Sequence, residues 1–257
     1  CGDDPDQRLD VYSPSTSHKE PLPVYVNIHG GGWTHGYKEW MGLNAPPLIA
    51  APCVYVSVAY RLAPAHRHPA QIEDCLSALA WIYKNISSFG ASPQRIHIGG
   101  HSAGGHLAAL VALRQDLYPA FGLPPNLIQT CFPFCGIYNL SDRVIHGVPE
   151  STHVNPILAH PNDARDASPI AFVTGNTTPF FVSWAQNDNP VCKAAGPAFA
   201  AALAREPGYV ACHEFPGFDH FWMHIDQLRK DNLWTKTLVG WMNSPPSKMN
   251  GFRDRVP

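Results

Sequence analysis

Short runs of apolar and β-branched residues alternate along the chain with longer stretches in which apolar residues recur at helical spacing. Gly, Pro, Asn and Asp flank the short runs, which is typical of buried strands. The pattern predicts an edge strand at 8–12 and further strands at 24–28, 54–58, 95–98, 127–132, 180–184 and 209–215. Between them it predicts helices at 69–89, 103–113, 193–205 and 226–241. This alternation predicts the α/β class, with a mostly parallel sheet covered by helices on both faces.

The length and composition favour one packed domain over 1–257. Hydrophobic residues make up 45% of the 257 positions and charged residues only 15%, which is typical of a globular chain. Residues 136–179 differ, because they are rich in Pro, Asn, Asp and His and show little periodicity. A loop of that length inside a compact domain is usually functional. We therefore predict a small cap or insertion over the site.

Charge and cysteine content narrow the choice of partners and compartment. The formal net charge is −2, so the chain has no basic field, and neither nucleic acid nor a membrane surface is expected as a partner. The seven scattered cysteines contain no C-x-x-C pair, which favours free thiols in a reducing, cytoplasmic compartment. Because the chain begins at Cys1 without a methionine, a removed leader and secretion stay open as an alternative.

The most specific motif is Gly-His-Ser-Ala-Gly at 100–104, which follows a predicted strand and precedes a helix of small residues. In such a nucleophile elbow the turn is too tight for side chains on either side, and the serine hydroxyl projects from the carboxyl end of the sheet. Without this flanking context the same five letters would fit an ordinary turn. The order of strand, motif and helix predicts that Ser102 is a nucleophile.

A second glycine-rich motif, His-Gly-Gly-Gly-Trp at 29–33, directly follows the strand predicted at 24–28. Glycines let backbone N–H groups approach an oxygen that becomes negative during acyl transfer. We expect the N–H groups of Gly31, Gly32 and Ala103 to form this oxyanion hole. A phosphate-binding loop is the alternative, but no G-K-[ST] or G-x-G-x-x-G pattern accompanies the motif.

A nucleophilic serine needs a histidine base and a carboxylate that orients it. Asp188 follows the strand predicted at 180–184, and His220 follows the one at 209–215. They are 32 residues apart, which leaves room for one helix and one strand. Asp219 is the rival carboxylate, although adjacent side chains seldom point at each other. The predicted triad is therefore Ser102, Asp188 and His220.

Other residues near these motifs have less specific interpretations. His97, His101 and His106, or His220 and His224, have spacings that zinc could use, but no carboxylate or cysteine completes a clean ligand set in the sequence. We therefore expect no metal and no cofactor. Aromatic residues beside the motifs predict an apolar pocket lined by Trp33, Tyr60, Trp184, Phe218, Phe221 and Trp222.

Taken together, these motifs resemble the hormone-sensitive-lipase-like branch of the α/β hydrolases. The resemblance rests on 29–33, on Tyr-Arg-Leu-Ala-Pro at 60–64 with Glu73-Asp74 following, and on 100–105. It covers nearly the whole chain, from Asp10 to about Trp241. His106-Leu107 after the elbow, and a first strand that begins near residue 8, also resemble arylformamidases, whereas members of the branch usually carry an N-terminal helical extension.

The resemblance implies an α/β-hydrolase fold and hydrolysis of a small to medium apolar or aromatic ester through the triad, without a cofactor. The expected partner is thus a small-molecule ester or amide, and assembly into a homodimer stays open. Three alternatives remain at this point: an arylformamidase or amidase, a ligand-binding protein on the same fold, and an acyl-transfer enzyme.

Overall fold

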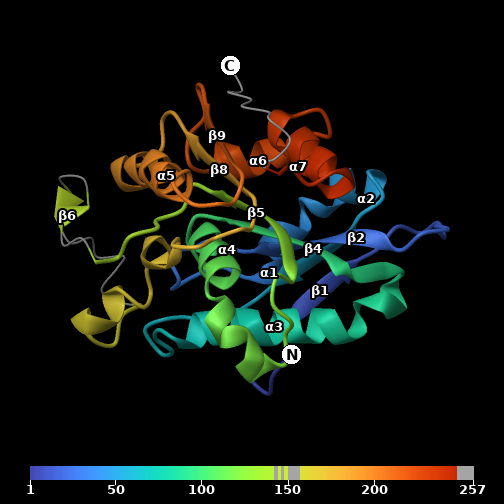
Figure 1. Cartoon of the computed structure of the whole chain (residues 1–257), viewed down its shortest axis with the longest axis horizontal. Coiled ribbons are helices and arrows are strands. Elements are labelled where there is room, and N and C mark those ends of the chain that lie inside the picture. The colour runs from blue at the N-terminus through green and yellow to red at the C-terminus, as the bar shows by residue number, and fades with distance from the viewer. Residues whose placement is uncertain (142–143, 146–147, 150–156, 248–257) are drawn as a thin grey trace.

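A seven-stranded sheet forms the centre of the computed structural model (Figure 1), which describes residues 1–141, 144–145, 148–149 and 157–247. The strand order is β1-β3-β2-β4-β5-β8-β9, and only β1 runs antiparallel to its neighbour β3. The strands are β1 Leu9–Tyr12, β2 Leu22–Ile28, β3 Val54–Val58, β4 Ala91–His101, β5 Ile128–Phe134, β8 Phe180–Ala185 and β9 Val210–Phe215. The predicted fold class is therefore confirmed.

Apolar clusters cover both faces of the sheet. Successive side chains of a strand point to opposite faces, so a single strand contributes to both clusters. In β2, Val24 and Val26 pack in one hydrophobic cluster, while Tyr25 packs in the other. Helices α3 Ala70–Asn85, α4 Ala103–Leu113 and α5 Pro190–Leu203 contribute to the first cluster. Helices α1 Lys38–Gly42, α2 Ala45–Ala50 and α7 Leu233–Asn243 contribute to the second. Helices thus cover the sheet on both sides, as Figure 1 shows.

Helix α4 lies against the middle of the sheet, and small residues allow this close approach. Its residues from Ala103 to Ala112 are all buried. A Cβ on Gly104 would stand 2.0 Å from the carbonyl oxygen of Ile28, and one on Gly105 would stand 2.8 Å from that of Gly100. Both distances are too short for a side chain, so these glycines fix the position of the helix start. The residue just before the helix is Ser102.

Residues 226–241 were predicted as one helix, but the structure divides the chain between residues 222 and 243 into three elements. They are α6 Trp222–Ile225, a 3₁₀ turn η5 Asp226–Leu228 and then α7. The Asn232 side chain accepts a hydrogen bond from Thr235 N at 2.7 Å and so caps a new helix. Helices α1 and α2 were not predicted, and the helix predicted at 69–89 is α3 followed by a separate 3₁₀ turn, η1 Ile86–Phe89.

The segment predicted as a cap, 136–179, lies partly outside the described residues. Its described elements are η3 Pro161–Ala164, η4 Pro169–Phe172 and the two-residue strands β6 Val144–Ile145 and β7 Val148–Pro149. Asp166 accepts from Arg114 at 2.7 Å and contacts the ring of His68 at 3.0 Å, which ties the segment to the domain. One further 3₁₀ turn, η2 Gln115–Phe121, follows α4. Among the described helices, none has the length and apolar character needed to span a membrane.

Candidate active site

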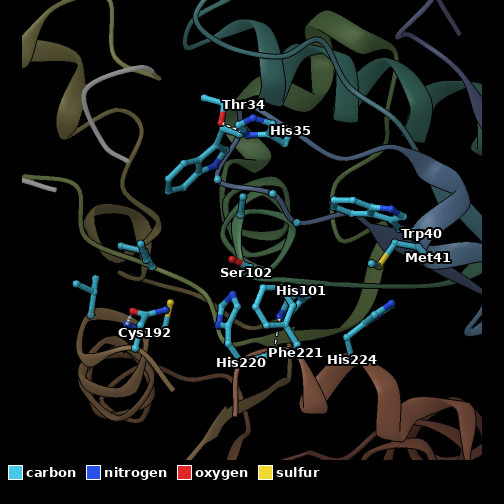
Figure 2. A pocket seen from close by; sticks show the side chains of 18 of the residues that line it. Thr34, His35, Trp40, Met41, His101, Ser102, Cys192, His220, Phe221 and His224 are labelled. Atoms are coloured by element: carbon cyan, nitrogen blue, oxygen red, sulfur yellow. Dashed lines mark hydrogen bonds between the residues drawn. The ribbon is translucent and has the colours of Figure 1, made fainter. Parts of the chain in front are cut away.

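Ser102 occupies a sharp turn between β4 and α4. Its backbone has φ 57° and ψ −120°, a conformation that few residues other than glycine adopt. Its N–H donates to the carbonyl of Phe134 at 2.9 Å, and its own carbonyl accepts from His106 N at 3.0 Å. A Cβ on Gly100 would lie 2.5 Å from the carbonyl oxygen of Gly104, so the turn needs glycine there. The turn directs the Ser102 side chain into a pocket (Figure 2).

Asp188 and His220 meet because β8 and β9 are neighbours in the sheet and each residue follows its strand. His220 Nδ1 donates to Asp188 Oδ1 at 2.7 Å, and the backbone N–H of Asn189 donates to the same oxygen, also at 2.7 Å. The Asp188 side chain is fully buried, while 19% of the His220 side chain is exposed. With its proton on Nδ1, the imidazole leaves Nε2 as an acceptor. Figure 2 shows the His220 ring directed toward Ser102.

Asp219, the rival carboxylate, has a different role. Its Oδ1 accepts from the backbone N–H groups of Phe221 at 3.0 Å and Trp222 at 2.7 Å. It therefore holds the start of α6. The structure pairs His220 with Asp188.

The loop after β2 lies directly against the elbow. Gly31 and Gly32 have φ values of 111° and 59°, and the Gly31 carbonyl accepts from His35 N at 3.0 Å, which closes the loop. A Cβ on Gly30 would lie 2.8 Å from the carbonyl oxygen of His101. Ala103 is the first residue of α4, where a helix has backbone N–H groups without an intrahelical acceptor. The three predicted donors therefore line one pocket together with Ser102.

Buried histidines hold this loop in place. Trp33 Nε1 donates to His106 Nδ1 at 3.1 Å, and His106 Nε2 donates to the carbonyl of Ala167 at 2.6 Å. The Tyr60 hydroxyl donates to the carbonyl of His29 at 3.1 Å, and the two rings stack with centroids 4.2 Å apart. Burial lowers the pKa of both His29 and His106 to about 4. Both imidazoles are therefore neutral near pH 7.

The pocket has a volume of about 1080 Å³ and a mostly apolar wall. Ser102, His220 and residues 30–32 of the loop after β2 all line it, and Figure 2 shows Ser102 at its centre. Apolar residues from α1, α5, α6 and their flanking loops form much of the rest, namely Trp40, Met41, Leu43, Ile137, Val191, Cys192, Phe221 and Ile225. Sequence reasoning missed all of these except Phe221. The residues after Asp188 could have been predicted to line the pocket, because a helix that starts directly after a site residue brings its first turn into the site.

Only two of the six predicted pocket aromatics, Trp33 and Phe221, line this pocket. The prediction for the other four is corrected, because each is turned elsewhere. Tyr60 is buried under the loop after β2, and Trp184 Nε1 donates to Glu214 Oε2 at 2.9 Å. Phe218 stacks on Phe215, and Trp222 is half exposed outside the pocket. Proximity to a motif in sequence did not determine which way these rings point.

One histidine, His101, and the thiols of Cys135 and Cys192 lie beside His220. His101 Nε2 donates to the carbonyl of His220 at 2.8 Å, and its ring packs against His224 with centroids 5.8 Å apart. Burial lowers the pKa of His101 well below its usual value. Burial raises the pKa of the Cys192 thiol to about 12, and burial followed by the nearby Asp188 carboxylate raises that of Cys135. All seven cysteines are free thiols, and five of them are buried.

Comparisons with known proteins agree with this architecture. A family model described as BD-FAE matches residues 9–203. Esterase LipC of Mycobacterium tuberculosis is 34% identical over 241 residues, which are 89% of this chain and 60% of LipC. Kynurenine formamidase of Salmo salar is 28% identical over 228 residues, covering 88% of this chain and 74% of that protein.

A solved structure, esterase B from Lactobacillus rhamnosis, superposes with a TM-score of 0.79 at 21% identity. The match covers 95% of this chain and 81% of that one, and at this identity it shows the fold alone. The chain spans about half the length of several curated relatives that it matches.

Proposed function

Because the chain belongs to the BD-FAE family of α/β hydrolases, we propose that it is a serine hydrolase that cleaves carboxylic esters. One observation carries the proposal. Ser102, on its strained turn, lines the same pocket as His220, and His220 is hydrogen bonded to the buried Asp188. Nucleophile, base and orienting carboxylate are the three groups that acyl transfer to a serine requires.

The first half of the reaction forms an acyl-enzyme. His220 Nε2 accepts the Ser102 hydroxyl proton as Oγ attacks the carbonyl carbon of the ester, and the carbonyl oxygen becomes an anion. The N–H groups of Gly31, Gly32 and Ala103 are the donors that stabilise this oxyanion. When the tetrahedral intermediate collapses, the carbon–oxygen bond to the alcohol breaks and His220 gives its proton to the leaving oxygen.

The second half releases the acid. A water molecule attacks the acyl carbon while His220 Nε2 takes one of its protons, and the proton then returns to Ser102 Oγ as the acyl bond breaks. Asp188 keeps the Nδ1 proton in place and stabilises the imidazolium that forms in both halves. The residues of this chain supply each proton transfer, so the proposed reaction uses no cofactor and no metal.

The pocket supports a small to medium ester with an apolar or aromatic part. Its wall is mostly apolar, and burial of apolar substrate surface contributes roughly 25 cal/mol per Å². Affinity should therefore rise with acyl length until the pocket is full. The proposed partner is this small molecule, and neither nucleic acid nor a membrane is part of the proposal.

A panel of p-nitrophenyl acetate, butyrate, octanoate and palmitate tests the proposal, with kcat/KM measured for each. We expect a maximum between acetate and octanoate and loss of that activity in Ser102→Ala. Equal rates for the native chain and Ser102→Ala across the panel would refute it, and no turnover by the native chain would favour a ligand-binding protein on this fold. Product analysis in the presence of an added alcohol separates hydrolysis from acyl transfer.

A second candidate function is hydrolysis of an aryl formamide. The observation that favours it is the similarity to kynurenine formamidase of Salmo salar, of which this chain covers 74%. A formyl group fills almost no acyl pocket, so the aryl side has to supply the binding energy. N-formylkynurenine turnover a hundredfold above that of the best ester would make this candidate the function.

A further inference from the structure

Donor atoms that metals prefer converge on the Asp188–His220 pair. One ligand atom from each of Asp188, Cys192 and His220 lies within 4.8 Å of the others. A second trio, His101, Cys135 and His220, meets the same limit. A carboxylate oxygen, a thiol sulfur and an imidazole nitrogen form a donor set typical of Zn²⁺. No such set was predicted from the sequence, because Cys192 and Asp188 complete it only in the fold.

Asp188 provides an independent sign of a ligand. Its Oδ1 takes three hydrogen bonds, from His220 Nδ1, Asn189 N and Asn189 Nδ2. Its Oδ2 is buried and accepts no N–H or O–H hydrogen bond in the described part of the chain, and the Cys135 thiol, a weak donor, lies beside the carboxylate. A buried carboxylate oxygen that has no strong donor is costly. A cation bound there would satisfy it.

We propose that Asp188, Cys192 and His220 form a binding site for a thiophilic divalent cation, with Zn²⁺ as its probe, and that the bound cation stops hydrolysis. The inhibition rests on the proposed function, whereas the binding does not. Three protein ligands leave one position of a tetrahedral ion for water. The ion enters from the pocket, because Cys192 and His220 both line it.

The distances allow this with small side-chain movements. Zn–S bonds of about 2.3 Å and Zn–N or Zn–O bonds of about 2.0–2.2 Å place tetrahedral donors roughly 3.3–3.7 Å apart. The thiol has to close from within 4.8 Å, and the imidazole has to move back from its 2.7 Å contact with Asp188. On binding, the Cys192 thiol proton and the His220 Nδ1 proton are released to solvent.

Inhibition follows from the loss of the Asp188–His220 hydrogen bond. With a cation on Nδ1, the carboxylate no longer orients the imidazole toward Ser102. A second positive charge on Nε2 beside the cation is also unfavourable, so His220 becomes a poor base.

The trio with Cys192 is favoured over the trio with Cys135. Both thiols are buried, but Cys192 lines the pocket and Cys135 does not. The Nε2 atom of His101 is already committed to the His220 carbonyl. Only the first trio contains the Asp188 carboxylate.

The experiment measures zinc binding and hydrolysis separately on the full chain. Isothermal titration calorimetry with ZnCl₂ gives stoichiometry and affinity, and p-nitrophenyl butyrate hydrolysis is referred to each variant's own metal-free rate. We expect one equivalent of zinc and at least a tenfold loss of rate in the native chain. Cys192→Ser should raise both the dissociation constant and the half-inhibiting zinc concentration at least tenfold. Cys192→Ala replaces it if the serine variant fails to unfold cooperatively.

Three further variants make each outcome decisive. Cys212→Ser removes an exposed thiol outside the cluster and should bind zinc as the native chain does. Ser102→Ala should keep the zinc affinity although it is inactive, so zinc bound by a chain that hydrolyses no ester would overturn the proposed function and leave the site intact. Absence of stoichiometric zinc, or unchanged affinity in Cys192→Ser, would overturn the site. Loss of binding in Cys135→Ser alone would assign it to the other trio.

Discussion

Replacing His106 by glutamine should reduce the acid sensitivity of the fold. Burial lowers the pKa of His106 from 6.5 to about 4. Its Nδ1 accepts from Trp33 Nε1 and its Nε2 donates to the carbonyl of Ala167. Protonation of Nδ1 would therefore bring two N–H donors, on His106 and Trp33, into contact without an acceptor between them. Between pH 6.5 and 4 the unfolded chain holds a proton that the folded chain does not. Stability therefore falls as pH falls through this window, by about 3 kcal/mol in total at about 1.4 kcal/mol per pH unit.

Urea unfolding of the native chain and of His106→Gln at pH 7.5, 6.5, 5.5 and 4.5 measures this effect. The variant should be less stable at pH 7.5, because it loses the two hydrogen bonds, but its free energy of unfolding should fall less on acidification. Between pH 7.5 and 4.5 the difference in decline should be about 2.5 kcal/mol. His18→Gln, at an exposed position, serves as the control and should follow the native curve. Parallel curves for the native chain and His106→Gln would refute the reasoning.

Three other changes test the packing, the pocket and the triad. Gly104→Ala should yield no folded protein in expression trials, since its Cβ would stand 2.0 Å from a β2 carbonyl oxygen. Its control, Gly240→Ala, has open space around the new Cβ and should unfold at the same temperature as the native chain or a higher one. Phe221→Ala removes a 72% exposed ring from the pocket mouth, so KM for aromatic esters should rise severalfold without a change in thermal unfolding. Asp188→Asn should lower kcat on the order of 10⁴-fold by analogy with serine proteases, and Asp219→Asn far less; the reverse ranking would exclude Asp188 from the triad.

Local signals were sufficient to predict the sheet and the order of its motifs. Strands β2, β3 and β8 are buried along their whole length and carry mostly apolar residues. Glycine at 100 and 104 is required by the close backbone contacts of the fold. Asp188 and His220 were predictable because parallel neighbouring strands end at the same edge of a sheet. The structure places these two side chains 2.7 Å apart.

The pocket wall could not be predicted in the same way. Trp184 and Tyr60 are adjacent to motif residues, yet the bond to Glu214 and the stack on His29 turn them away from the site. Conversely, Trp40 lines the pocket from α1, a short helix that was not predicted. Cys192 lines it from the first turn of α5, which begins earlier than predicted. Ring orientation depends on contacts between segments far apart in sequence, and no local pattern encodes these contacts.

Labelling with a fluorophosphonate tests the central claim most directly, because only an activated serine is phosphonylated at an appreciable rate. Peptide mapping by mass spectrometry should locate one adduct on Ser102, and His220→Ala should abolish it while thermal unfolding stays cooperative. An adduct on another serine, or undiminished labelling in His220→Ala, would contradict the assignment of Ser102 as a nucleophile activated by His220.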